Sequence, residues 1–407
     1  MARKISLFGT IVFILVSCSN KKEVSQWRGP ERDGKYPQSG LLTQWPDEGP
    51  DIVWSYEGLG AGHGSVSFAE DQLFVLGMPD TIGVIYSFDM EGNLLWKKKY
   101  GLEWYANYTG PRSTPTIING LLYFVSGQGV VFCMDTETGK VLWSVDMFEK
   151  FGAQETKWGI AESPLLDGDR IIITPGGTQH NIVALDRFTG DLIWTSKGNG
   201  EPSAYCSPIL VHHNDTRLII TMTAESVLGV DADNGLTLWR IEHRQRNDIQ
   251  ANTPVYHDDR IFCVSEDADT ADGHIMIELS EDGKSAELGW RNDERFNLMG
   301  GMIYHEGCIY STGFRKKEWY CFDAGTGELN YISDQVSGGA IIFAEGLFYC
   351  YGTDGVLALV DADETGCKVI SSFTVQLGTD QHWAHPVIHE GRLYVRHGNA
   401  LVCYDIS

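Results

Sequence analysis

The chain of 407 residues carries 55 Asp and Glu against 31 Lys and Arg, which gives a formal net charge of −24 at pH 7. Such a surface repels phosphate backbones and anionic headgroups, so the composition argues against nucleic acid as a partner and against membrane binding through positive charge. The length would suggest two or three domains, but the repeats described below indicate a single ring.

An apolar run over residues 5–16 follows Arg3 and Lys4. It is too short to span a bilayer and is typical of a signal-peptide core. We therefore expect a signal peptide over residues 1–17 and a polar tether over residues 18–25.

The end of the signal segment, L-V-S-C at residues 15–18, resembles a bacterial lipobox. The resemblance implies cleavage before Cys18 and lipidation of its thiol. Ser19, not Asp, follows the cysteine, so by resemblance to Gram-negative sorting an inner-membrane retention signal is absent. An ordinary secretory signal with an incidental cysteine is the alternative.

One sequence unit recurs along the chain, and residues 131–143 (V-F-C-M-D-T-E-T-G-K-V-L-W) are its clearest copy. An alternating strand ends at Asp135, a Thr138-Gly139 turn follows, and a second short strand reaches Trp143. A period of about 40 to 50 residues with several short strands is typical of a β-propeller. A tryptophan ends most copies of this unit, and we expect these tryptophans to have a structural role by packing between neighbouring repeats. They are Trp54, Trp96, Trp143, Trp194, Trp239 and Trp290.

Each period also begins with two strands joined by a tight polar turn, so that every repeat has four strands. The second strands number eight and are expected at residues 73–76, 121–125, 170–174, 217–221, 260–264, 308–311, 347–351 and 393–395. The last repeat lacks a fourth strand, whereas residues 51–55 carry a closing tryptophan with no strands before it. The N-terminal strand should therefore complete the last blade.

These observations predict an all-β fold: an eight-bladed β-propeller of four-stranded antiparallel blades, with the ring closed by the N-terminal strand. We assign residues 51–407 to the propeller. Residues 26–50 are expected to form an N-terminal extension that packs on it.

The Asp-x-x-Thr-Gly-x-x-x-Trp pattern resembles the tryptophan-docking motif of PQQ-type eight-bladed propellers, and residues 26–34 (Q-W-R-G-P-E-R-D-G) are similar to bacterial PQQ-like repeat proteins. That family contains quinoprotein dehydrogenases and non-enzymatic members such as the outer-membrane assembly lipoprotein BamB. The resemblance covers roughly residues 26–407.

Function is expected on the face that carries the long connections, because loops on a rigid scaffold are where sites form. The residues that precede the inner strands should point into the central funnel, where a ring of mixed charges with flanking aromatics could bind a small polar ligand, a sugar or a peptide. These candidates are His63, Arg112, Glu162, Tyr205, Asn252, His382 and His385, with aromatic clusters nearby that include Tyr108 and Trp158. A solvated pore whose polar groups satisfy one another is the favoured interpretation of these residues.

By resemblance to quinoproteins, Glu162 and Asn252 would hold calcium, and Arg112 would face a carboxylate of PQQ. Against this hypothesis, the sequence has no adjacent Cys-Cys pair and no haem motif, and no funnel aspartate stands out as a general base. We therefore expect no catalytic residue and no cofactor, with PQQ plus calcium as the alternative.

The acidic stretch over residues 266–273 offers Asp267, Asp269 and Asp272 as metal ligands. Its spacing departs from an EF-hand loop, and a solvated loop is the favoured interpretation. The cysteines form no C-x-x-C pair, so apart from Cys18 they are read as packed thiols, with a disulfide as the alternative.

The sequence thus favours a monomeric lipoprotein anchored in the outer membrane of a Gram-negative bacterium. It would act as a non-catalytic scaffold that binds an envelope protein or a small polar ligand, and outer-membrane protein assembly is one form of this hypothesis. The alternatives are a PQQ-dependent alcohol or sugar dehydrogenase and a carbohydrate-binding propeller.

Overall fold

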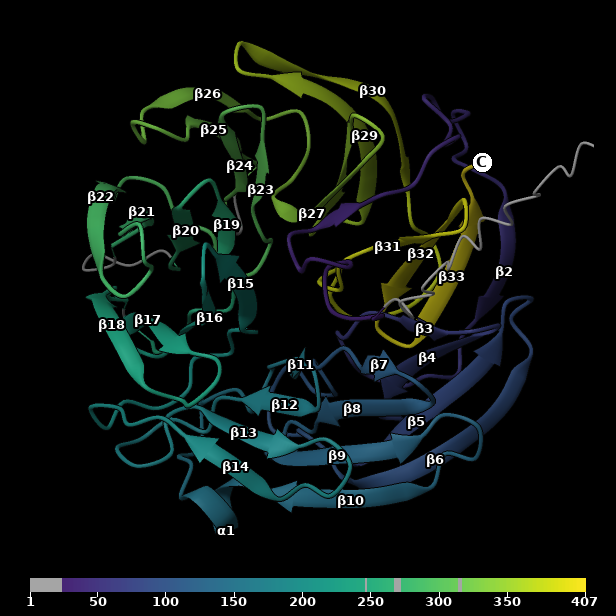
Figure 1. Cartoon of the computed structure of the whole chain (residues 1–407). Coiled ribbons are helices and arrows are strands. Elements are labelled where there is room, and N and C mark those ends of the chain that lie inside the picture. The colour runs from purple at the N-terminus through teal and green to yellow at the C-terminus, as the bar shows by residue number, and fades with distance from the viewer. Residues whose placement is uncertain (1–23, 246, 267–271, 314–316) are drawn as a thin grey trace, which may run out of the picture.

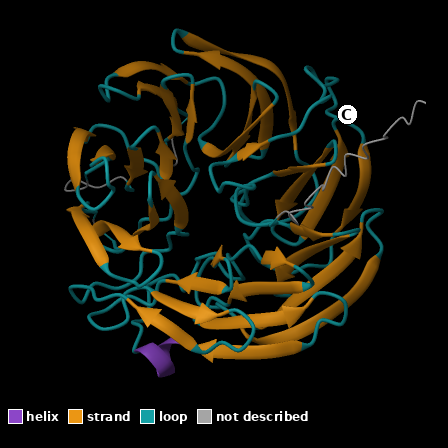
Figure 2. Cartoon of the chain, viewed as in Figure 1, coloured by secondary structure: helices purple, strands orange, loops and turns teal. Residues whose placement is uncertain are grey.

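The computed structural model describes residues 24–245, 247–266, 272–313 and 317–407. Eight β-sheets stand radially around a central axis (Figure 1). Strands and their connecting loops make up nearly all of the molecule (Figure 2), and the one helix of the described residues, α1 (Met147–Phe151), is short. The predicted eight-bladed propeller is confirmed.

Each blade pairs its strands in antiparallel order from the axis outwards. From blade 1 to blade 8 the strands are β3 (Ser67–Ala69), β4 (Gln72–Gly77), β5 (Ile82–Asp89), β6 (Leu94–Leu102); β7 (Thr116–Ile118), β8 (Leu121–Val125), β9 (Val130–Asp135), β10 (Val141–Asp146); β11 (Leu165–Asp167), β12 (Arg170–Ile173), β13 (Val183–Asp186), β14 (Leu192–Thr195); β15 (Ile209–His213), β16 (Thr216–Met222), β17 (Ser226–Asp231), β18 (Thr237–Glu242); β19 (Val255–His257), β20 (Arg260–Val264), β21 (His274–Leu279), β22 (Ala286–Asn292); β23 (Ile303–His305), β24 (Cys308–Thr312), β25 (Trp319–Asp323), β26 (Leu329–Ser333); β27 (Gly339–Ala344), β28 (Leu347–Gly352), β29 (Val356–Asp363), β30 (Gly366–Thr374); and β31 (Val387–His389), β32 (Arg392–His397), β33 (Ala400–Asp405), β2 (Ile52–Tyr56).

The N-terminal strand closes the ring as predicted. Strand β2 pairs antiparallel with β33, placing Trp54 opposite Cys403, so the last blade takes its outer strand from the other end of the chain. This arrangement joins blade 8 to blade 1 and leaves β33 without a free edge.

The tryptophan at the start of an outer strand packs against the turn of the next blade. A Cβ atom on Gly139 would lie 2.7 Å from the Trp96 ring, so only glycine fits beneath that indole. In blade 5, Trp290 Nε1 donates a hydrogen bond of 3.0 Å to the carbonyl of Ala324 in blade 6. Apolar clusters also run between neighbouring blades, such as Ile172 of blade 3 with Ile219 of blade 4.

One sheet departs from the four-stranded pattern. A short strand β1 (Lys35–Tyr36) adds to blade 7 on its inner side and runs parallel to β27. The repeats do not predict this fifth strand, because it belongs to a segment that precedes them. It brings the N-terminal residues to the centre of the ring (Figure 1).

The described cysteines are free thiols, all of them buried except Cys367, which is half-buried. Burial raises the pKa of Cys206 and Cys321 to about 12, so these thiols stay protonated at neutral pH. Within the described ranges, no helix has the length and apolar character needed to cross a bilayer.

Candidate functional site

Residues 24–36 enter the ring and close it from one side. Ser25 forms a bridge with Ile117 of β7, and after β1 the backbone N–H of Leu41 donates to the carboxylate of Glu345 in the β27–β28 turn. The first strand of each blade ends at the tight turn that joins it to the second strand. The segment therefore enters and leaves on the face of the ring that carries these tight turns, which we call the turn face. The opposite face, which carries the long connections, is called the loop face.

Two arginines fasten this segment to the inner ends of the blades. The guanidinium of Arg28 donates to the carbonyl oxygens of Met302 at 2.7 Å and Ile341 at 3.3 Å, and that of Arg32 donates to the carbonyl of Pro164 at 2.7 Å. Burial lowers the pKa of each arginine to about 10, so both remain charged at neutral pH. Backbone carbonyls supply the acceptors that a buried cation requires.

Trp27 forms the floor of a cavity, that is, the part of its wall nearest the turn face. Its Nε1 donates to Thr253 Oγ1 at 2.8 Å, and its ring meets that of His385 at 4.7 Å between centroids. His385 Nδ1 lies 3.0 Å from Arg28 Nη1, and its Nε2 lies 3.0 Å from the carbonyl of Met299. Because arginine can only donate, Nδ1 accepts and Nε2 carries the proton. Burial, with Arg28 nearby, lowers the pKa of this neutral imidazole to about 3.

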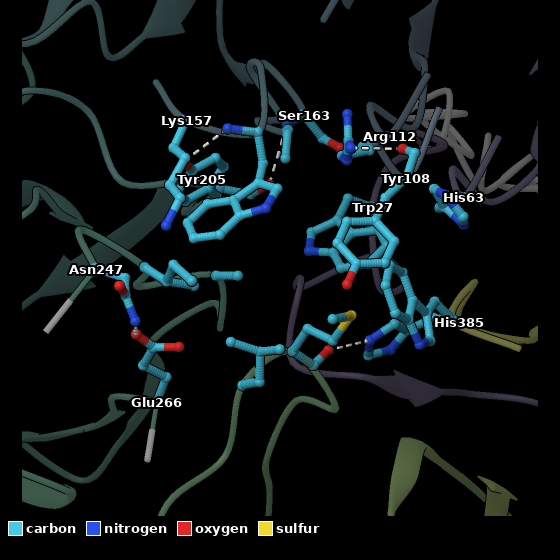
Figure 3. A pocket seen from close by; sticks show the side chains of 18 residues that line it. Trp27, His63, Tyr108, Arg112, Lys157, Ser163, Tyr205, Asn247, Glu266 and His385 are labelled. Atoms are coloured by element: carbon cyan, nitrogen blue, oxygen red, sulfur yellow. Dashed lines mark hydrogen bonds between the residues drawn. The ribbon is translucent and has the colours of Figure 1, made fainter. Parts of the chain in front are cut away.

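Above this floor lies a cavity of about 360 Å³ that opens among the long connections (Figure 3). Apolar and aromatic side chains make up most of its wall. The lining residues are Trp27, His63, Tyr108, Arg112, Lys157, Trp158, Ala161, Ser163, Tyr205, Ser207, Asn247, Ile249, Ala251, Glu266, Leu298, Met299, Trp383 and His385.

No described carboxylate lies within ion-pair distance of the two cations in the wall, although the buried Glu103 partly offsets the lowering of the Arg112 pKa by burial. Arg112 donates to the backbone carbonyls of Tyr108 at 2.6 Å and Asn107 at 3.3 Å, and burial lowers its pKa to about 10. The ammonium of Lys157 lies 4.4 Å from the centroid of the Trp158 ring. Neither cation belongs to an ion pair within the part of the chain that the structure describes. The wall is therefore positive in a strongly acidic protein.

His63 belongs to the same wall. Its side chain is 9% exposed, and its two ring nitrogens are buried without a hydrogen bond of ordinary geometry to a described residue, although the Tyr108 backbone lies close enough to offset in part the lowering of its pKa by burial. Its ring centroid lies 5.1 Å from that of Trp383. Burial, Arg112 and Arg396 lower the pKa of His63 to about 3, so the imidazole is neutral and carries one N–H.

Two tyrosines of the wall have a left-handed backbone, which non-glycine residues adopt at a cost of about 1 kcal/mol or more. The φ angle is 43° at Tyr108 and 70° at Tyr205. The Tyr108 ring lies 4.9 Å from that of Trp383, and the Tyr205 hydroxyl accepts from the backbone N of Trp158 at 3.3 Å. Strain of this kind is common in binding loops.

Four of the predicted funnel residues meet at this cavity, namely His63, Arg112, Tyr205 and His385. Glu162 and Asn252 do not line it. Glu162 is buried and accepts from the backbone N of Thr174 at 2.9 Å, while Asn252 donates to the carbonyl of Asn297 and accepts from the N–H of Gly301.

His382, the seventh candidate, lies beside the cavity and packs within blades 7 and 8. Its Nδ1 is 2.5 Å from the Tyr351 hydroxyl, and its ring stacks on His397 at 3.7 Å. Burial and His397 lower the pKa of His382 to about 4. This histidine therefore has partners of its own.

The geometry does not fit calcium-dependent PQQ. The quinoprotein resemblance implied Glu162 and Asn252 as calcium ligands. The polar atoms of both side chains instead form hydrogen bonds with protein groups behind the cavity wall. No group of three or more His, Cys, Asp or Glu able to hold a metal occurs within the described ranges. Asp272 forms an ion pair with Arg291 at 3.2 Å, and Asp267 and Asp269 lie outside the described residues.

Sequence reasoning missed Trp27 and Trp383, although both form major parts of the wall. Trp27 belongs to the Q-W-R-G stretch that carried a family resemblance, but no repeat pattern places it at the axis. Trp383 lies between the candidates His382 and His385 in the sequence, and this position was the only feature that could have indicated a place in the cavity wall.

The radial blades, the docked tryptophans and the axial cavity define a PQQ-like eight-bladed propeller. A family model described as "Outer membrane protein assembly factor BamB" matches residues 81–333, more than half of the chain. The chain therefore belongs to this BamB family.

Individual relatives match over shorter stretches. The chain is 25% identical over 188 residues to the outer membrane protein assembly factor BamB of Kangiella koreensis, covering 45% of this chain and 44% of that protein. It is 26% identical over 155 residues to the quinoprotein alcohol dehydrogenase PedH of Pseudomonas putida, covering 36% and 24%. The chain thus spans half or less of the length of the curated relatives that it matches.

Solved structures share the fold. BamB from Moraxella catarrhalis aligns with a TM-score of 0.61 at 13% identity, over 87% of this chain and 97% of that one. A quinohemoprotein alcohol dehydrogenase from Comamonas testosteroni aligns with a TM-score of 0.64 at 13% identity, over 92% and 79%. The same propeller therefore serves both an assembly factor and enzymes.

Proposed function

We propose that the chain is a non-catalytic binding scaffold of the Gram-negative envelope, held at the outer membrane by a lipid on Cys18. Its loop face and central cavity would receive a partner of the outer-membrane protein assembly machinery or a small ligand. Membership of the BamB family supports the assembly role. Cys18 lies outside the described residues, so the anchor rests on the lipobox pattern alone.

The observation that carries this proposal is the cavity itself. It is closed on the turn face by Trp27 and lined by aromatic rings, and its two cations are held by backbone carbonyls and by the Trp158 ring, not by carboxylates of the wall. Pockets of this size and lining are typical of ligand sites. Among the described residues of its wall, Glu266 is the acidic one, and it accepts a hydrogen bond from Asn247 at 2.6 Å.

Crosslinking in intact envelopes tests the assembly role. A photoreactive residue at Tyr105, which is exposed on the loop face, should capture a component of the outer-membrane assembly machinery. The same group at Lys99, on outer strand β6, is the matched control and should not. Capture from both positions or from neither contradicts the proposal.

Thermal unfolding with PQQ and calcium tests the dehydrogenase alternative, because a ligand that binds the folded state raises the midpoint. No shift is expected. A saturable rise that Glu162→Ala abolishes would favour the enzyme instead. A rise with neutral sugars would favour the carbohydrate-binding alternative, which rests on the same aromatic walls.

A further inference from the structure

Charge is unevenly distributed along the cavity. Figure 3 shows Arg112 and His63 at one side, and Lys157, Asn247 and Glu266 at the other. Lys157 and Glu266 carry opposite charges, so that side is close to neutral overall. At the Arg112 side, the cavity wall itself holds a cation and no described carboxylate, and the buried Glu103, which partly offsets the lowering of the Arg112 pKa by burial, does not line the wall.

The Arg112 side can bind one anionic group. The terminal nitrogens of Arg112 hold the backbone of residues 107–110, and its Nε makes no hydrogen bond within the described part of the chain. His63, whose imidazole is neutral, lines the same side; its two ring nitrogens are buried, and the Tyr108 backbone is the neighbour that partly offsets the lowering of its pKa by burial. A charged guanidinium and a neutral imidazole on one side of the cavity are the kinds of donor that match the two oxygens of a carboxylate.

Between the two sides, aromatic rings form much of the wall, together with the aliphatic side chains of Ile249, Leu298 and Met299. Trp383 stands beside both Tyr108 and His63, at centroid distances of 4.9 and 5.1 Å, and Trp27 forms the floor. Aromatic faces favour another ring at stacking or edge contact over an aliphatic chain. The strained backbone at Tyr108 holds one of these rings in place.

We propose that the cavity binds one aromatic ring that carries a single carboxylate, presented by a small molecule or by the C-terminal residue of a peptide. Recognition needs no metal, because its donors are Arg112 and His63. Glu266 on the far side disfavours a ligand with several carboxylates. The inference deepens the proposed binding function and rests on it for its biological role.

Calorimetric titration of the full chain in detergent, with and without EDTA, tests this proposal. Phenylacetate and indole-3-acetate are expected to bind saturably in both conditions. Their uncharged amides should bind at least about tenfold more weakly, since a hydrogen bond to a charged group contributes roughly that factor. Cyclohexylacetate and benzene-1,3,5-tricarboxylate should also bind more weakly. Equal binding of the amides, or tighter binding of the tricarboxylate, would overturn the proposal.

Two variants and one control assign the site. Arg112→Gln should weaken phenylacetate binding about tenfold. His63→Phe, which keeps an aromatic ring but removes the N–H, should weaken it several-fold. Lys99→Gln makes the same charge change on exposed strand β6 and should leave binding unchanged. Should Arg112→Gln fail to fold, unchanged binding by His63→Phe would still refute the site.

A titration with a peptide distinguishes the two possible ligands, a small molecule and the C-terminal residue of a peptide. The tripeptide Ala-Ala-Phe as a free acid is compared with its C-terminal amide. Binding of the free acid alone indicates a chain terminus, whereas exclusion of both, with binding of phenylacetate, indicates a small molecule. If no acid binds while crosslinking still captures an assembly component, only the ligand class is wrong. If the acids bind but no partner is captured, the assembly role is wrong.

Discussion

Glu162, which precedes the inner strand of blade 3, is a buried carboxyl whose titration falls close to neutral pH. Burial raises its pKa from 4.5 to about 8, with partial compensation from hydrogen bonds of Thr174 and from Arg32. The folded state therefore keeps a proton that the unfolded chain releases. Stability from this group is fully present below pH 4.5 and is lost as the pH rises to about 8.

Replacement of Glu162 by glutamine should remove this pH dependence, because the amide stays neutral and still accepts from Thr174. Between about pH 5 and pH 8, the wild type should lose ~1 kcal/mol or more of unfolding free energy relative to Glu162→Gln. Urea denaturation at each pH measures the difference. Glu149→Gln, at an exposed position of α1, is the control, and parallel wild-type and Glu162→Gln curves would contradict the assignment.

The docking tryptophans offer a matched pair at half-buried positions. Trp290 Nε1 donates to Ala324, whereas Trp96 Nε1 is buried without a partner among the described residues. Trp290→Phe should therefore destabilise the fold by about 1 kcal/mol more than Trp96→Phe does, since only the former loses a hydrogen bond. Thermal unfolding of the two variants checks the order, and equal losses would show that ring packing alone holds the motif.

At the scale of elements, the repeats were readable because each strand recurs at a fixed place relative to a glycine turn and a tryptophan. The second strand expected at residues 260–264 is β20, and the one expected at residues 121–125 is β8. Strand β1 and Trp27 have no repeat to mark them. Their partners, such as Phe343 for Lys35, lie some 300 residues away, and no local pattern encodes such a contact.

The absence of a local sequence pattern for long-range contacts also explains which residues of the candidate site could be predicted and which could not. The positions before the inner strands were identified from the repeat, and two of them, His63 and Arg112, line the cavity. Whether a side chain faces the cavity or the blade behind it depends on local backbone direction, and Glu162 and Asn252 turn towards the blades. Alternation alone does not report this choice in irregular loops.

Ring closure by β2 makes a prediction about this element. Deletion of residues 51–55 removes the partner of β33 and exposes a strand edge in blade 8, so the variant should aggregate on concentration. Light scattering measures this. A synthetic peptide of residues 49–58 should reduce aggregation by taking the vacant place, whereas a scrambled peptide should not. A soluble deletion variant of unchanged stability would contradict the closure.

For the whole molecule, the inserted N-terminal segment makes the two faces different. Residues 24–36 reach the axis from the turn face, with Ser25 bridged to Ile117, and the cavity opens on the opposite loop face. Ser25 follows Cys18 by seven positions in the sequence, and an extended chain of that length spans at most about 25 Å. A lipid on Cys18 would therefore hold the turn face towards the membrane.

This orientation predicts that the cavity mouth faces away from the lipid. A fluorophore on a cysteine at Asn119, in the turn of blade 2, should be quenched by lipid-attached quenchers in proteoliposomes, whereas one at Tyr105 on the loop face should not. Cys367→Ser removes the half-buried thiol from the background. Failure of the chain to enter the lipid fraction would refute the anchor, but equal quenching at both sites would refute only the orientation. The quenching ratio thus decides whether a soluble partner has free access to the cavity.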